Sequence, residues 1–174
     1  SALTGHLVLT SLHTNDAASA VTRLLEMGIQ PFLIASTVIC TVAQRLIRNV
    51  CKDCSASFAP SETDFQNLAL IDPEAKKTMP SQLHKGKGCL NCKRTGFRKR
   101  SGIFEMLVPD HDIRELIMSK ASSEEIELMA INKGMKTLRQ DGLEKIRSAL
   151  QRLKKSCVQL RRCRDACICL SSPR

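Results

Sequence analysis

Four cysteines of this chain form two closely spaced pairs. Cys51 stands with Cys54 and Cys89 with Cys92, each pair in a C-x2-C arrangement, with residues 55–88 between the pairs. Each pair folds into a tight turn whose two thiolates reach one metal ion, and two such turns complete a tetrahedral shell of four sulfurs that suits Zn²⁺. A shell closed by four protein ligands leaves no position for a substrate. The spacing therefore predicts a structural zinc site, with free thiols or a redox pair as the alternative.

The remaining cysteines lack such a pattern. Cys40 stands alone in an apolar run, and four others crowd the end of the chain, at Cys157, Cys163, Cys167 and Cys169. The first residues do not have the basic start and apolar core of a secretory signal. Paired C-x2-C units in such a sequence favour metal over disulfides.

Two of the four histidines, His6 and His13, flank a predicted strand from Leu7 to Leu12. Residues seven apart on a continuous strand face opposite ways, so these two are not expected to share a metal. His13 falls where the strand ends and a helix begins. That helix start, after Thr14 and Asn15, is expected to offer free N–H groups and a positive dipole end to a phosphate. A core or capping histidine is the alternative.

The rest of the pattern indicates a mixed α/β chain. Helical spacing of apolar residues follows a cap at Asn15 or Asp16 and ends at Gly28, and β-branched residues predict a second strand over 37–50. A capping box at Ser61 predicts a short helix between the cysteine pairs, and 79–88 is predicted as a loop.

After the second cysteine pair, a strand is predicted over 101–108, followed by three short helices. Ser122 with Glu125 forms a capping box, Gly134 is a stop signal, and the last helix is capped at Thr137 and runs to about Leu150.

The net charge of +10 is concentrated at the end of the chain. Residues 151–174 hold seven Lys or Arg against Asp165 alone. A basic tail can bind nucleic acid or anionic lipid, although a solvated or disordered tail explains it as well. The chain has no Trp or Tyr, so a surface for stacking bases is poorly supplied. The longest uncharged run, 27–44, is interrupted by Gln30, Pro31 and Gln44, which argues against a transmembrane span.

Several blocks of this sequence resemble one family, in the family's order. The segment ALTGHLVLTSLHTNDAASAVTRLLEMGIQPFLIAS is similar to the histidine box and following helix of the type II secretion and type IV pilus assembly ATPases. VAQRLIRNVCKDC, GCLNCKRTGFRKRSGIFEML and KGMKTLRQDGLEKI resemble later blocks. The similarity runs from Ala2 to about Arg147 and is interrupted only between the cysteine pairs.

The resemblance implies the carboxy-terminal part of a RecA-like P-loop ATPase domain with an inserted four-cysteine zinc subdomain and a carboxy-terminal helical bundle. The expected segments are a partial ATPase core over 1–50, the zinc subdomain over 51–100, a strand with helices over 101–150, and a basic tail over 151–174. The parent would be a homo-hexamer in the cytoplasm, peripheral at the inner membrane, that hydrolyses ATP with magnesium and works with the platform and assembly proteins of a secretion or pilus machine. No specific nucleic acid is expected.

The resemblance also assigns candidate site residues. The histidine box places His6 and His13 near the nucleotide as candidate catalytic residues. Candidate nucleotide-binding residues are Thr10, Thr14 and Asn15 in the same block and Arg45 and Arg48 near a subunit boundary. A solvated strand edge is the alternative for the two arginines. The four paired cysteines map to the family's zinc subdomain.

Two departures from the family qualify these expectations. The sequence has no G-x4-GK[ST] phosphate loop and no acidic block of Walker B type, which the family carries upstream of the histidine box. A carboxy-terminal fragment without ATPase activity of its own is therefore expected. The family ending is also lost after Ser148, and synonymous codons exist that restore an ending like F-E-E-V-L-R when read two nucleotides later. A frameshift near Ala149 would explain a disordered tail beyond about Ser156.

Two other functions are compatible with the residues alone. The cysteine turns and the net charge allow a stand-alone zinc-ribbon module that binds nucleic acid through Lys and Arg. A non-functional pseudogene product is the third possibility. The sequence does not distinguish secretion, pilus assembly and DNA uptake, because relatives in all three systems share the quoted blocks.

Overall fold

The computed structural model describes residues 2–62, 82–147 and 166–170. The chain divides into two compact units. The first unit comprises Ser1–Gln44, Phe104–Leu138 and Arg164–Arg174, and the second comprises Arg45–Ile103 and Arg139–Cys163. Two long strands, β2 (Val38–Val50) and β5 (Phe97–Leu107), contribute residues to both units. The four-segment division expected from the sequence remains a prediction.

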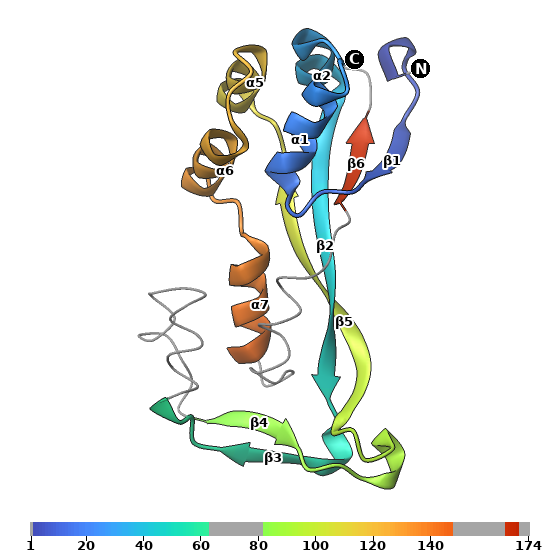
Figure 1. The fold of residues 1–174 in the computed structure, drawn as a ribbon, viewed down its shortest axis with the longest axis vertical. Coiled ribbons are helices and arrows are strands. Elements are labelled where there is room, and N and C mark those ends of the chain that lie inside the picture. The colour runs from blue at the N-terminus through green and yellow to red at the C-terminus, as the bar shows by residue number, and fades with distance from the viewer. Residues whose placement is uncertain (1, 63–81, 148–165, 171–174) are drawn as a thin grey trace. The chain divides into compact units, whose positions relative to one another are not determined.

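The first unit is built on a four-stranded sheet in the order β1-β6-β2-β5 (Figure 1). β1 (Val8–Leu12) and β2 both pair antiparallel with β6 (Ala166–Leu170), which lies between them. In the backbone register, Val8 pairs with Leu170 and Leu12 pairs with Ala166. On β5 the burial alternates along the strand, with Ile103, Glu105 and Leu107 buried and the residues between them exposed, as the two-residue period of a strand requires.

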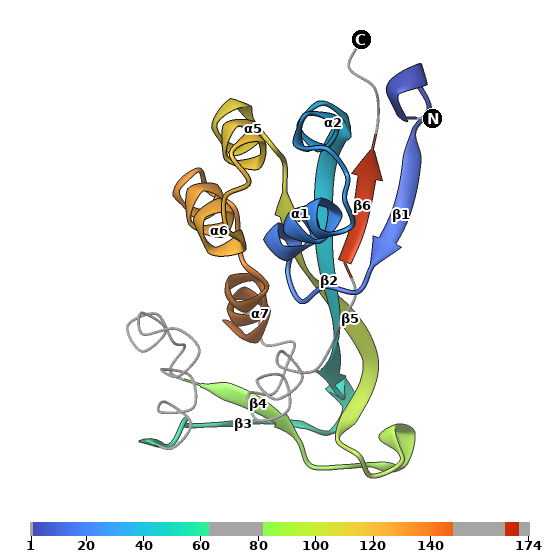
Figure 2. The ribbon, with the colours of Figure 1, turned by 45° about the horizontal axis from the view of Figure 1, so that its top comes forward.

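Four helices of the first unit form one group beside these strands in Figures 1 and 2. They are α1 (Ala17–Glu26), α2 (Pro31–Thr37), α5 (His111–Met118) and α6 (Ser123–Asn132). α1 packs against α2 and α6, and α5 packs against α2 and α6. The core between these helices and the strands is almost entirely aliphatic, and its largest fully buried members include Ile34, Ile117 and Ile126.

Local sequence signals explain where these helices start and stop. Asp16 caps α1, its carboxylate accepting from the Ser19 N–H at 2.7 Å. Ser122 and Glu125 form the expected capping box of α6. Gly28 and Gly134 adopt positive φ angles of 83° and 97° just after α1 and α6, a conformation that favours glycine.

The second unit contains the metal-ligand candidates on short elements. A two-stranded antiparallel ribbon, β3 (Ser55–Phe58) with β4 (Leu83–Gly86), is flanked by two 3₁₀ turns, η2 (Lys52–Cys54) and η3 (Leu90–Cys92). α7 (Leu138–Arg147) begins at the last residue of the first unit. A further 3₁₀ turn, η1 (Ala2–Thr4), precedes β1.

The structure differs from the sequence-based expectations at three elements. α2 occupies residues between Gly28 and the second predicted strand, where no helix was predicted; Pro31 fits the first turn of a helix, where its missing N–H costs nothing. β4 lies within the predicted loop 79–88. β6 lies within the tail expected to be disordered, where an apolar run with β-branched Ile168 pairs on both edges. The predicted helix after Ser61 and the tail outside β6 lie beyond the described residues.

Candidate functional sites: a four-cysteine centre and the histidine loop

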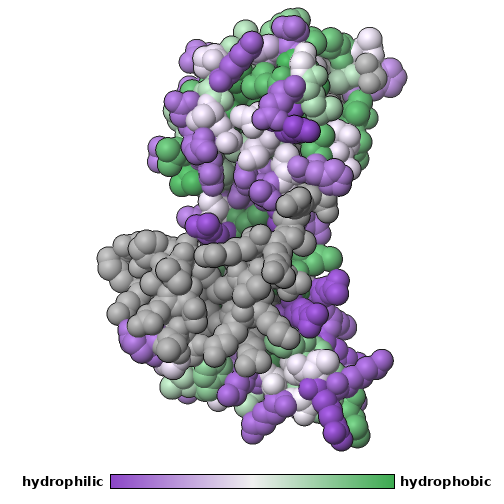
Figure 3. Space-filling view, in the orientation of Figure 1, coloured by the Kyte–Doolittle hydropathy of each residue, from purple (hydrophilic) through white to green (hydrophobic). Residues whose placement is uncertain are grey.

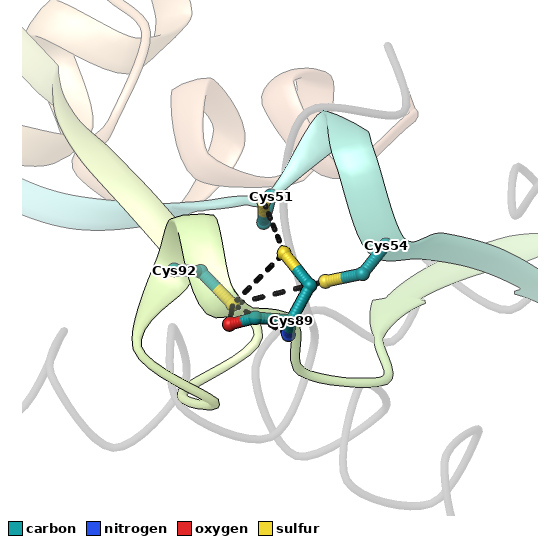
Figure 4. Close-up of side chains that lie close together, drawn as sticks. All are labelled: Cys51, Cys54, Cys89 and Cys92. Carbon is teal, nitrogen blue, oxygen red and sulfur yellow. Dashed lines mark hydrogen bonds between the residues drawn. The ribbon is translucent and has the colours of Figure 1, made fainter.

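The four predicted ligand sulfurs lie together (Figure 4). The Sγ atoms of Cys51, Cys54, Cys89 and Cys92 all fall within 4.8 Å of one another. Cys51 is 3.9 Å from Cys89, Cys54 is 3.8 Å from Cys92, and Cys89 is 3.7 Å from Cys92. Four sulfurs bound to one Zn²⁺ at about 2.3 Å in a regular tetrahedron are about 3.8 Å apart. The separations therefore fit a tetrahedral thiolate site and are far longer than a disulfide bond, which is about 2.05 Å.

Backbone N–H groups point at these sulfurs, as a thiolate site requires. The N–H of Gly88 donates to Cys54 Sγ at 3.3 Å. The N–H groups of Cys89 and Gly96 both donate to Cys92 Sγ at 3.2 Å. Each hydrogen bond stabilises negative charge on the sulfur that receives it.

Backbone hydrogen bonds and burial together separate the acidities of the thiols. Hydrogen bonds from the backbone, chiefly that of Cys89, lower the pKa of Cys92 to about 6. Burial raises the pKa of Cys54 to about 12, and burial also raises the pKa of Cys51. Thiolates this close repel one another, so all four ionise together only when a cation lies between them. The donor set thus fits a thiophilic divalent ion such as Zn²⁺.

Two glycines allow the two cysteine turns to approach each other. Gly96 has a φ of 74°, and a Cβ built there would lie 2.6 Å from the carbonyl oxygen of Gly86. A Cβ at Gly86 would lie 2.0 Å from the carbonyl oxygen of Gly96. Gly86 was not predicted as part of the site; a glycine three residues before the second C-x2-C pair was the available signal.

Asp53 links the two halves of the cysteine centre from outside. Its Oδ2 accepts from Asn91 Nδ2 at 3.1 Å and forms an ion pair with Arg98 at 3.2 Å. Asp53 lies between the first two cysteines, and Asn91 lies between the last two. These side-chain contacts connect one cysteine turn to the other. Residues that surround metal ligands commonly orient the ligands in this way.

The described part of the second unit carries an exposed basic surface. The segments 51–62 and 82–101, which contain the cysteines, hold eight Lys or Arg residues. Their only acidic residues are Asp53 and Glu62. All eight are exposed: Lys52, Lys85, Lys87, Lys93, Arg94, Arg98, Lys99 and Arg100. Hydrophilic side chains gather over this unit in the lower part of Figure 3. A surface of this sign favours anionic partners.

The histidine loop lies in the first unit, between β1 and α1. His13 is exposed at the end of β1, and Thr14 is buried, its hydroxyl donating to the Asp16 carbonyl at 3.2 Å. Asn15 is also exposed. His6 lies before β1, exposed, with Nδ1 3.1 Å from Thr4 Oγ1. The strand separates the two histidines, and no described metal cluster includes either of them.

One expectation about this loop is contradicted for two of its N–H groups. The start of α1 was expected to offer free N–H groups to a phosphate, but carboxylates already accept from two of them. The Ala17 N–H donates to Glu105 Oε1 at 2.8 Å, and the Ser19 N–H donates to Asp16 Oδ1 at 2.7 Å. These acids also offset the positive end of the helix dipole. Fewer of the amides at this helix start are therefore available to an anion than the sequence pattern indicated.

The remaining candidate residues lie on strands. Thr10 is an exposed residue of β1. Arg45 and Arg48 lie on β2 in the second unit; Arg45 is only 3% exposed and Arg48 is half-buried. Arg45 is therefore not on a solvated strand edge, because it is almost fully buried. A buried guanidinium needs partners that compensate for its lost hydration.

Comparison with known proteins decides the family. The family model described as "Type II/IV secretion system protein" matches residues 1–158. The chain belongs to this family. A type IV pilus assembly ATPase PilB of Thermus thermophilus is 47% identical over 144 residues, which cover 83% of this chain and 16% of the relative.

Further family relatives come from secretion systems. A type II secretion system ATPase E of Vibrio cholerae is 44% identical over 87% of this chain and 29% of its own length. A type II secretion system protein E of Pseudomonas aeruginosa is 42% identical over 83% of this chain and 28% of its own length. The chain thus spans less than a third of each relative. Among the described residues of this family member, no helix has the length and apolar character needed to cross a membrane.

Proposed function

We propose that this chain is the carboxy-terminal part of a hexameric ATPase that powers type II protein secretion or type IV pilus assembly. The observation that carries the proposal is the family match over 1–158, together with relatives named as ATPases of both machines. A stand-alone nucleic-acid module, the second candidate, fits the basic surface but not a match that runs through both units. We propose the first unit as part of a RecA-like ATPase domain.

In this proposal the parent protein acts in the cytoplasm at the inner membrane and engages the platform and assembly proteins there. ATP with Mg²⁺ is its substrate, and the phosphate loop that cradles it belongs to a part of the parent outside this sequence. This chain contributes the exposed side chains of the histidine loop, with Thr10, Arg45 and Arg48 as further candidates. His13 is the first of these, because a side-chain donor would add to a helix start at which two of the amides are already engaged.

The assignment of His13 is tested by His13→Ala in the longer ATPase. If His13 stabilises charge that develops on the transferred phosphate, the hydrolysis rate falls roughly 10²-fold or more. His111→Ala is the matched control, because His111 is an exposed histidine of α5 with its side chain 82% accessible. A near-native rate for His13→Ala would remove His13 from the site and leave the family membership intact.

We also propose that the four-cysteine centre holds structural zinc. The supporting observations are the sulfur separations near 3.8 Å and the N–H groups aimed at the sulfurs. Zinc there would cross-link the two chain segments that carry the cysteine pairs, and it would take no part in hydrolysis because its shell is closed.

Elemental analysis of the purified chain should find about one zinc per molecule, with sulfur distances near ~2.3 Å by X-ray absorption. Cys89→Ser should lose the metal, whereas Cys40→Ser should keep it, since Cys40 is a half-buried thiol outside the cluster. Protein purified under reducing conditions without zinc would contradict the proposal.

A further inference from the structure

A buried carboxylate on β5 joins the starts of two helices. Glu105 is 3% exposed, and its two oxygens accept from different backbone groups. Oε1 accepts from the N–H of Ala17, the first residue of α1, at 2.8 Å. Oε2 accepts from the N–H of Leu138, the first residue of α7, at 3.1 Å. One side chain therefore fixes two helix starts that are far apart in sequence.

The chemistry of this position is specific for a carboxylate. A buried carboxylate is costly unless hydrogen bonds compensate it, and helix starts supply both unsatisfied N–H groups and a positive dipole end. A glutamine of the same shape has one acceptor oxygen and an NH₂ group that only donates. It can serve one of the two amides but not both.

Ala17 is held from a second side as well. The hydroxyl of Thr41 on β2 donates to the Ala17 carbonyl at 2.9 Å, and both residues are 0% exposed. Side chains of two strands thus fix both backbone groups of the residue that directly follows the His13–Asp16 loop. Two hydrogen bonds stabilise the loop itself. The Asp16 carboxylate accepts from the Ser19 N–H, and the Thr14 hydroxyl donates to the Asp16 carbonyl.

We propose that Glu105 is a positioning residue for the histidine loop. Through Ala17 it fixes the end of the loop that presents His13, and through the other oxygen it makes the position of that loop depend on the position of Leu138. A displacement of Leu138 would then change the position of the loop that carries His13. The catalytic meaning of this link rests on the function proposed above, whereas the link itself does not.

Glu105→Gln tests the link directly in the 174-residue chain. We expect the amide of Ala17 or of Leu138 to exchange with solvent roughly 5- to 30-fold faster, because one buried hydrogen bond is lost. The imidazole NMR signals of His13 should shift while those of His84 and His111 stay. Glu115→Gln is the matched control, since Glu115 is an exposed glutamate of α5 with its side chain 71% accessible.

A purely structural role would lower stability without a selective shift at His13. Unchanged exchange and unchanged His13 signals in Glu105→Gln would therefore overturn the proposal. If that variant does not fold, Thr41→Val takes its place, because it removes the hydroxyl that holds the Ala17 carbonyl and nearly preserves shape. Thr41→Ser, which keeps the hydroxyl, should restore the native His13 signals.

Kinetics of the longer ATPase separate this inference from the proposed function. Glu105→Gln should lower kcat about tenfold with KM for ATP little changed, because a misplaced group loses transition-state contacts first. If His13→Ala retains full activity, the proposed role of His13 fails, while the exchange data still support or overturn the link. If His13→Ala is inactive but Glu105→Gln keeps native kcat, the function stands and the positioning role is refuted.

Discussion

The approach of Gly96 to Gly86 gives a quantitative prediction for zinc affinity. Gly96→Ala places a Cβ at a residue with φ of 74° and 2.6 Å from the Gly86 carbonyl oxygen. The left-handed conformation costs about 1–2 kcal/mol for a residue other than glycine, and a clash with backbone that cannot swing away costs about 1–3 kcal/mol. Because metal binding and folding of the site are coupled, about 2 kcal/mol at the low end weakens zinc binding roughly 30-fold.

Two other glycines separate these costs. Gly86 has no positive φ, but its Cβ would lie 2.0 Å from the Gly96 carbonyl oxygen, so Gly86→Ala tests the clash by itself. Gly28 has a φ of 83° with nothing within 4 Å of its added Cβ, so Gly28→Ala tests the backbone conformation by itself. Gly28→Ala should lower the melting temperature and leave zinc affinity unchanged.

The assay is competition for zinc between the chain and a chromophoric chelator at fixed pH. Gly96→Ala and Gly86→Ala should both weaken zinc binding, and Gly28→Ala should show the wild-type value. Wild-type affinity in both Gly86→Ala and Gly96→Ala would refute the argument that close approach of these two backbones builds the cysteine centre.

Two further predictions concern the first unit. Lys133 forms ion pairs with Asp110 and Asp112, and these ion pairs lower the pKa of both carboxyl groups. The ion pairs therefore stabilise the fold above about pH 4, and this stabilisation is lost as the pH falls through the lowered pKa values. Because the groups are partly exposed and screened by solvent, the effect is small, and Lys133→Met should reduce the difference in melting temperature between about pH 6 and pH 3. Ending the chain before β6 should speed amide exchange along β1, which pairs with β6, while zinc content stays unchanged; slow exchange of β1 in the truncated chain would contradict the observed pairing.

The cysteine centre was largely predictable from sequence. The C-x2-C turns are local structures, and their spacing alone brings two thiolates within reach of one ion. The approach of one turn to the other was not predictable, because it depends on Gly86 and Gly96 meeting across the chain and on Asp53 bonding to Asn91 and Arg98.

Local signals also determined most elements of the first unit. Asp16, Ser122, Gly28 and Gly134 set helix ends through their own side chains or backbone freedom, and the predicted strands around β1, β2 and β5 were confirmed. β6 was missed because its pairing is decided by the open edges of β1 and β2, which are distant in sequence.

The histidine loop shows most clearly what tertiary structure added. The sequence by itself identified His13 at the junction of a strand and a helix, since hydrophobic period and capping residues are local properties. Only the fold decided that the first amide of that helix is engaged, because its acceptor, Glu105, comes from a strand 88 residues away. A helix end looks free in sequence, but burial requires its polar groups to find partners, and those partners are chosen in three dimensions.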